Sequence, residues 1–93
     1  MESRERLNPP ELLSLAIRRV REGTLACEQE ARLFAGPGRQ NCCALCDGAI
    51  RSEEIEYEVE AARPGASVLQ LHFHRPCYYA WRQACTGDLR APA

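Results

Sequence analysis

A small α+β domain is the fold class that the sequence predicts, with residues 1–93 forming a single domain. Apolar residues near the N-terminus recur at three- and four-residue intervals, which indicates an amphipathic helix. Polar and apolar residues alternate over 54–61 and again over 69–73, which indicates a β-hairpin. Pairs of Cys and His with two-residue gaps stand on either side of that hairpin, and such pairs are typical of a zinc-binding domain.

The N-terminal part, residues 9–35, is expected to contain one helix or two. Asn8 can cap a helix that begins at Pro9, Glu11 approximates a capping box, and Gly23 follows the expected end at Glu22. Its apolar face is formed by Leu12, Leu13, Ala16, Ile17 and Val20. We expect Leu13, Ile17 and Val20 to pack on the hairpin face that carries Ile55, Tyr57, Leu69 and Leu71.

A second helix is predicted over 25–35, although its apolar periodicity is poorer. Cys27 is interpreted as a small buried apolar residue of this helix and not as a metal ligand. Leu15, on the polar side of the first helix, is expected to be singly exposed. Residues 36–41 are rich in Gly and polar residues and form the next loop.

The hairpin sorts its side chains onto two faces. Its first strand places Ile55, Tyr57, Val59 and Ala61 on one face and predicts a solvent-facing row of carboxylates, Glu54, Glu56, Glu58 and Glu60, on the other. For the apolar rows to share a face, paired residue numbers must have an even sum, for example Tyr57 with Leu71 and Glu56 with His72. That requirement predicts an odd-length loop or a bulge near Pro64 and Gly65.

The last helix is expected to begin near Pro76, with Cys77 in its first turn, and to end at Thr86 and Gly87. The tail, residues 88–93, is predicted to be disordered.

Four residues are predicted to hold one structural zinc ion: Cys43, Cys46, His74 and Cys77. Cys42 and His72 are the nearest alternatives. With Cys42 as ligand, three residues instead of two would separate it from Cys46. His72 lies within the hairpin on the face that carries the glutamates, where a cross-strand pair with a glutamate is expected.

Composition limits the classes of function. All twelve cationic side chains are Arg and the net charge is −1, so the chain has no overall field that attracts polyanions. The N-terminus has no apolar stretch of the kind a signal peptide needs, so a cytoplasmic location is expected. In that reducing compartment, six cysteines favour metal binding over disulfides.

Along residues 42–86, a tight turn with two cysteines is followed by the hairpin and then by a helix that carries the second ligand pair. This is the order of elements in a treble-clef finger. The stretches Cys43-Ala-Leu-Cys46 and His74-Arg-Pro-Cys77-Tyr-Tyr-Ala-Trp81 resemble the PARP-type zinc finger, and in ligand order they also resemble LIM modules. The first resemblance implies recognition of DNA ends, and the second implies binding to proteins.

We expect a structural zinc finger that acts as a small protein-interaction or regulatory module, with nucleic-acid binding as the alternative. The stretch from Cys42 to Cys85 contains six acidic residues and only four arginines, and this excess of negative charge disfavours contact with phosphates. An enzyme is not expected, since four protein ligands leave no open metal position for an activated water.

Overall fold

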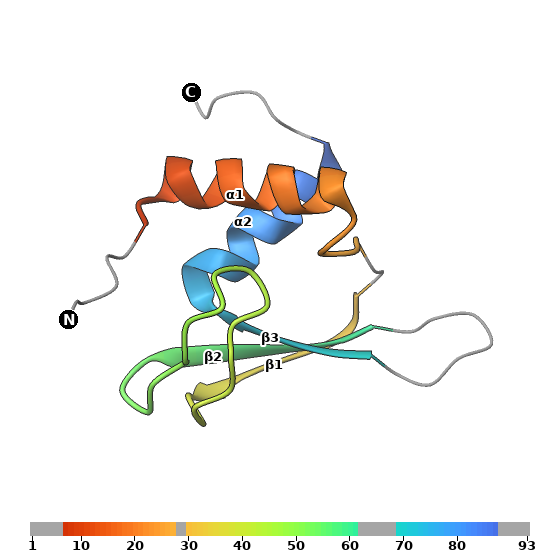
Figure 1. The fold of residues 1–93 in the computed structure, drawn as a ribbon. Helices are drawn as coiled ribbons and strands as arrows, with labels where there is room; N and C mark the ends of the chain where they lie inside the picture. Colours follow the sequence, from red (N-terminus) through yellow and green to blue (C-terminus); the bar gives the residue numbers. More distant parts are fainter. Residues whose placement is uncertain (1–6, 28–29, 62–68, 88–93) are drawn as a thin grey trace.

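The structure is a computed structural model, and it describes residues 7–27, 30–61 and 69–87. Its elements are α1 (Pro9–Glu22), β1 (Glu30–Pro37), β2 (Ile55–Ala61), β3 (Leu69–His74) and α2 (Arg75–Thr86). The three strands form one antiparallel sheet in the order β1-β2-β3. Both helices lie on one side of this sheet, and α2 lies between α1 and the strands (Figure 1).

Helix α1 has the bounds and caps that the sequence predicts. The side chain of Asn8 accepts a hydrogen bond from the N–H of Glu11, and the Glu11 carboxylate accepts one from the N–H of Asn8, both at 2.9 Å. Gly23 ends the helix with φ of 80°, a left-handed conformation that favours glycine. In the described ranges, neither helix has the length and apolar character that crossing a membrane requires.

The predicted packing of α1 on the hairpin is wrong, because α1 packs on α2. Leu12 is 4% exposed and Ala16 is fully buried, whereas Ile17 and Val20 are only partly buried. Leu15 also packs against the core and is not the singly exposed residue that was expected. Helix α2 covers β2 and β3, and α1 packs on the side of α2 that faces away from the sheet (Figure 1).

The predicted second helix over 25–35 is also wrong. Residues 30–37 form strand β1, which pairs with β2 from Pro37 opposite Ile55 to Glu30 opposite Ala61. The backbone groups of β2 that face away from β3 need partners, and pairing with β1 supplies them. This tertiary demand overrides the weak helical periodicity of the segment.

The β2–β3 hairpin forms with the predicted parity but in a different register. Tyr57 pairs with Phe73, and Val59 pairs with Leu71, so each partner lies two residues further along than expected. Alternation has a period of two, and it therefore cannot distinguish registers that differ by two residues. The expected bulge near Pro64 and Gly65, like the tail 88–93, lies outside the described residues.

The core lies between α2 and the sheet. The ring of Trp81 stacks on that of Phe73 with centroids 4.9 Å apart, and both side chains are fully buried. The indole N–H of Trp81 donates to the carbonyl of Ala26 at 3.0 Å, which ties the segment after α1 to α2.

A disulfide joins Cys27 to Cys85, one turn beyond Trp81, with their Cα atoms 5.5 Å apart. The expectations of a buried free Cys27 and of no disulfides are therefore wrong. Cys27 and Cys85 are 58 residues apart, so no short spacing in the sequence marks them as a pair. The packing of the segment after α1 on α2 brings the two sulfur atoms together.

Candidate metal centre

The first half of the centre is a tight turn that carries Cys43 and Cys46. The N–H of Asp47 donates to the carbonyl of Cys43 at 2.9 Å, and the N–H of Cys43 donates to the carbonyl of Gly48 at 2.8 Å. Asp47 has φ of 68°, a conformation that Asp tolerates better than most residues. The turn therefore directs both sulfur atoms to one side.

Two contacts fix this turn, the knuckle (residues 43–48), against the rest of the fold. The N–H of Ala44 donates to the carbonyl of His72 in β3 at 2.7 Å, and Arg19 of α1 donates to the carboxylate of Asp47 at 2.8 Å. The knuckle is thus held at the outer edge of β3.

The second half of the centre is the junction between β3 and α2. His74 occupies the N-cap position of α2, and Cys77 lies in the first turn of the helix. The backbone N–H of His74 donates to the sulfur of Cys43 at 3.5 Å. One potential ligand atom from each of Cys43, Cys46, His74 and Cys77 lies within 4.8 Å of the other three.

The imidazole of His74 is oriented by contacts on both of its nitrogens. Its Nδ1 lies 3.3 Å from the sulfur of Cys46 and 3.9 Å from that of Cys77. Its Nε2 lies 3.1 Å from the carbonyl oxygen of Ala49 and 3.4 Å from the carboxylate of Glu54. If Nε2 carries the proton, Nδ1 presents its lone pair to the three sulfurs.

The three thiols cannot all ionise at such short distances. Hydrogen bonds from Cys43 and Cys77, with help from the backbone N–H of Gly48, lower the pKa of Cys46 far below its ordinary value. Contact with Cys43 and Cys46, together with burial, raises the pKa of Cys77, and contact with Cys46 raises that of Cys43. A bound cation would remove this conflict, because it stabilises all three thiolates at once.

These four residues could hold a metal ion. Three thiolates and one imidazole form a soft donor set of the kind that tetrahedral sites use, and two sulfurs bound to one zinc ion lie about 3.8 Å apart. The observed separations of up to 4.8 Å approach that value.

The two alternative ligands lie outside this group. Cys42 is exposed and forms an isolated antiparallel β-bridge with Ala49 beside the knuckle. His72 is paired elsewhere, since its Nδ1 lies 2.6 Å from the carboxylate of Glu56. The expected Glu–His pair is thus present, although the Cα partner of His72 is Glu58.

Sequence reasoning missed the burial of Glu56. This residue is 5% exposed, and its carboxylate also accepts hydrogen bonds from the N–H of Arg39 at 3.0 Å and from the side chain of Asn41 at 2.9 Å. Glu54 is similarly turned inward. The predicted solvent-facing row of four carboxylates is therefore wrong, because the loop before the knuckle folds over this end of the sheet.

Fold and centre together define a small α+β domain with a possible Cys₃His metal site. Comparison with protein-family models, with curated proteins and with solved structures finds no match to this chain.

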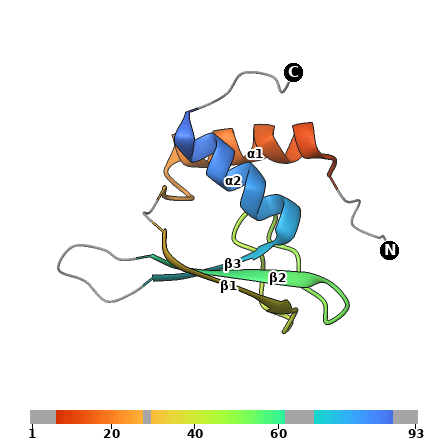
Figure 2. The ribbon, with the colours of Figure 1, turned by 180° about the vertical axis from the view of Figure 1, so that it is seen from behind.

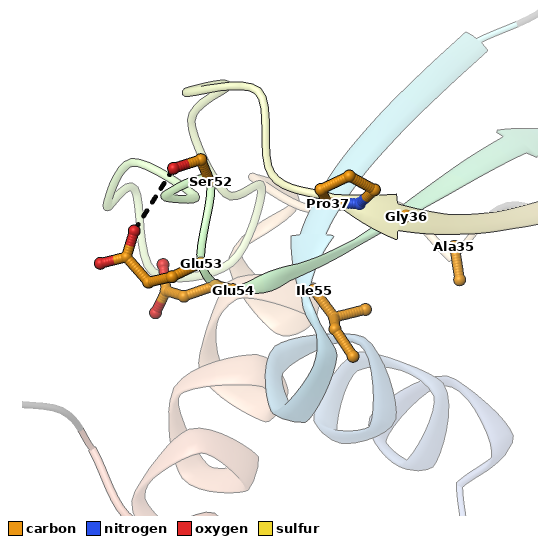
Figure 3. Close-up of a pocket in the computed structure, with 7 residues that line it drawn as sticks. All are labelled: Ala35, Gly36, Pro37, Ser52, Glu53, Glu54 and Ile55. Atoms are coloured by element: carbon orange, nitrogen blue, oxygen red, sulfur yellow. Dashed lines mark hydrogen bonds between the residues drawn. The ribbon is translucent and has the colours of Figure 1, made fainter.

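A shallow hollow beside β1 is separate from this centre. It is lined by residues 35–37 and 52–55, and none of the four potential ligands contributes to it (Figure 3).

Proposed function

We propose that the chain is a structural zinc-binding module whose Cys₃His group takes one zinc ion in a treble-clef arrangement. The observation that supports this most directly is the convergence of the knuckle cysteines with His74 and Cys77 at the start of α2. Zinc matches this mixture of thiolates and imidazole, and the ion would join the knuckle to the β3–α2 junction. The same order of elements underlies the resemblance to PARP-type and LIM fingers.

The proposed ion has a structural role and no catalytic one. Four protein ligands complete a tetrahedral sphere, so no position is open for a water that could be activated. The carboxylate of Glu54 contacts Nε2 of His74 and the backbone N–H of Arg51, and both contacts support the centre. These contacts suit an orienting role for Glu54.

We further propose that the module acts through protein contacts. Several large apolar side chains are exposed on its surface: Leu33, Phe34, Ile55 and Tyr79. Apolar side chains on a small domain favour a protein partner over a polyanion.

Nucleic-acid binding is the second candidate. The inward turn of Glu54 and Glu56 removes part of the charge repulsion that the sequence suggested, while Arg18 and Arg39 remain exposed. Arg19, by contrast, is paired with Asp47.

Fluorescence anisotropy separates the two candidates. We expect nicked, blunt and single-stranded oligonucleotides to bind with only non-specific affinity, about 10⁻⁴–10⁻⁶ M at physiological salt. Submicromolar binding that Arg18→Ala or Arg39→Ala weakens would favour a nucleic-acid function instead. Copurification of the tagged protein with and without nuclease gives an independent check, since a protein partner survives nuclease treatment.

A further inference from the structure

The two edges of the sheet differ. The outer edge of β3 is occupied by the knuckle, through the N–H of Ala44 on the carbonyl of His72 and the N–H of His74 on the sulfur of Cys43. Strand β1 forms the opposite edge, and β2 is the only described helix or strand that contacts it. Figure 2 shows β1 at the near edge of the sheet, in front of β2.

The hydrogen-bond alternation of β1 identifies the groups on its outer edge. The N–H of Gly38 donates to the carbonyl of Glu54, so Gly36 and Phe34 also direct their backbone groups toward β2. The N–H and C=O groups of Leu33 and Ala35 therefore point outward. Pro37 occupies the next outward position, where its missing N–H breaks no bond within the sheet.

We propose that this edge pairs antiparallel with β1 of a second copy of the chain, about a two-fold axis at Phe34. In this register Leu33 of one copy lies opposite Ala35 of the other, so the outward backbone groups of both residues are paired. Phe34 lies opposite its own counterpart, and Arg32 lies opposite Gly36. This dimer requires neither zinc nor another kind of protein, but it uses Leu33 and Phe34, two of the exposed apolar residues on which the proposal of protein contacts rests.

Shape and charge both favour this partner. A hollow of about 160 Å³ lies over Gly36, and its lining includes Phe34, Glu56 and Glu58, with Arg39 at its side. A Cβ placed on Gly36 meets no atom within 4 Å, so the space above this residue is open. Arg32 is exposed on the same face of β1 and would enter the hollow of the second copy, between the Phe34 ring and the carboxylate of Glu58.

The opposite face of the strand fits in the same register. Ala35 and Ile55 point toward the helix side of the sheet in Figure 3. On this face Leu33 and Ile55 are exposed, at 39% and 46%. Large residues then meet small ones across the two-fold axis, because Leu33 faces Ala35 and Arg32 faces Gly36. The net charge of −1 opposes the association of two copies only weakly.

Sedimentation velocity of the metal-loaded protein tests the proposal. We expect a monomer–dimer equilibrium between about 1 and 100 µM, as for a small interface. Ala35→Pro removes an outward N–H without removing a bond within the sheet, and it should abolish the dimer, whereas Ala35→Ser should retain it. Arg32→Glu and Gly36→Val should each weaken association at least about tenfold, and Arg18→Glu, on α1, should not.

Cysteine cross-linking tests the register. In a Cys42→Ser background, Phe34→Cys should form a disulfide-linked dimer on mild oxidation, since facing residues of a non-hydrogen-bonded pair have Cα atoms about 4.5 Å apart. Leu33→Cys should not form a disulfide-linked dimer, because residue 33 of one copy lies opposite residue 35 of the other, and the two cysteines would be too far apart. A wild-type protein that stays monomeric at 100 µM, or cross-linking through Leu33→Cys in place of Phe34→Cys, would overturn the proposal. If Ala35→Pro fails to fold, the cross-linking pair still decides.

Discussion

The carboxylate of Glu54 lies 3.4 Å from Nε2 of His74, on the side of the imidazole that faces away from the cysteine sulfurs. It accepts a hydrogen bond from the backbone N–H of Arg51 at 2.8 Å, which fixes its position. A carboxylate in this place holds the ring in orientation and increases the basicity of the nitrogen that would bind the proposed ion.

Glu54→Gln should therefore weaken zinc binding by about 10- to 100-fold. Competition with a chromophoric chelator gives the affinity. Glu53→Gln is the matched control, since this neighbouring carboxylate is exposed and, among the described residues, pairs with Ser52 and Arg51 and not with the four potential ligands. Equal affinities for the two variants would remove Glu54 from the supporting contacts of the centre.

The buried carboxylate of Glu56 predicts a pH dependence. Burial acts to raise its pKa, but hydrogen bonds from Asn41, His72 and the N–H of Arg39 outweigh burial, and the net pKa is lowered from 4.5. A lowered pKa in the folded state stabilises the protein above the unfolded-state value, and this contribution is lost as the pH falls through the folded-state value.

We therefore expect the free energy of unfolding of the wild type to exceed that of Glu56→Gln at pH 7. The difference should shrink as the pH falls below 4.5. Urea unfolding of both proteins at a series of pH values measures it, and comparison with the variant cancels the acid sensitivity of the thiolates. A difference that does not change with pH would show that the Glu56 carboxylate contributes no linked stability.

The Cys27–Cys85 disulfide closes a loop of 58 residues between the segment after α1 and the end of α2. Replacing both cysteines with Ser should lower the free energy of unfolding by about 2–4 kcal/mol, because the unfolded chain regains freedom. Denaturant unfolding measures the loss. Mass spectrometry after alkylation of the purified protein provides the check on the bond itself: if all six cysteines are alkylated without a reductant, the disulfide is absent in solution.

The packing of α1 on α2 predicts a difference between two neighbouring positions. Leu12→Ala removes a side chain that is 4% exposed and should cost about 2–4 kcal/mol, whereas Ile17→Ala, at a partly buried position, should cost less. The melting temperatures of the two variants give the order. A larger loss for Ile17→Ala would instead favour the originally expected packing on the hairpin.

The elements with strong local signals could be predicted from the sequence. Helix α1 has a capping box, apolar residues at helical spacing and a left-handed glycine at its end. The first strand of the hairpin has an uninterrupted alternation of apolar and acidic residues. The pairs Cys43–Cys46 and His74–Cys77 could also be predicted from their two-residue spacing, and the structure brings the two pairs together.

What could not be predicted depends on contacts between distant segments. Strand β1 forms because β2 requires a partner, and its own pattern of residues resembles a poor helix. Cys27 and Cys85 have no spacing signal, and Glu56 is buried by a loop whose path the alternation of β2 does not encode. In each case the determining interaction lies outside the segment whose pattern was interpreted.

The central claim is that Cys43, Cys46, His74 and Cys77 hold one structural zinc ion, and metal analysis combined with unfolding tests it most directly. We expect one equivalent of zinc in the freshly purified protein, and loss of the native circular dichroism spectrum when a strong chelator removes it. The reason is that structural zinc contributes about 10–16 kcal/mol, more than a small domain can lose. Cys43→Ser should lose both zinc and fold, and Cys42→Ser should lose neither. Less than half an equivalent of zinc in folded protein, or a Cys43→Ser variant with zinc and native spectra, would contradict the claim.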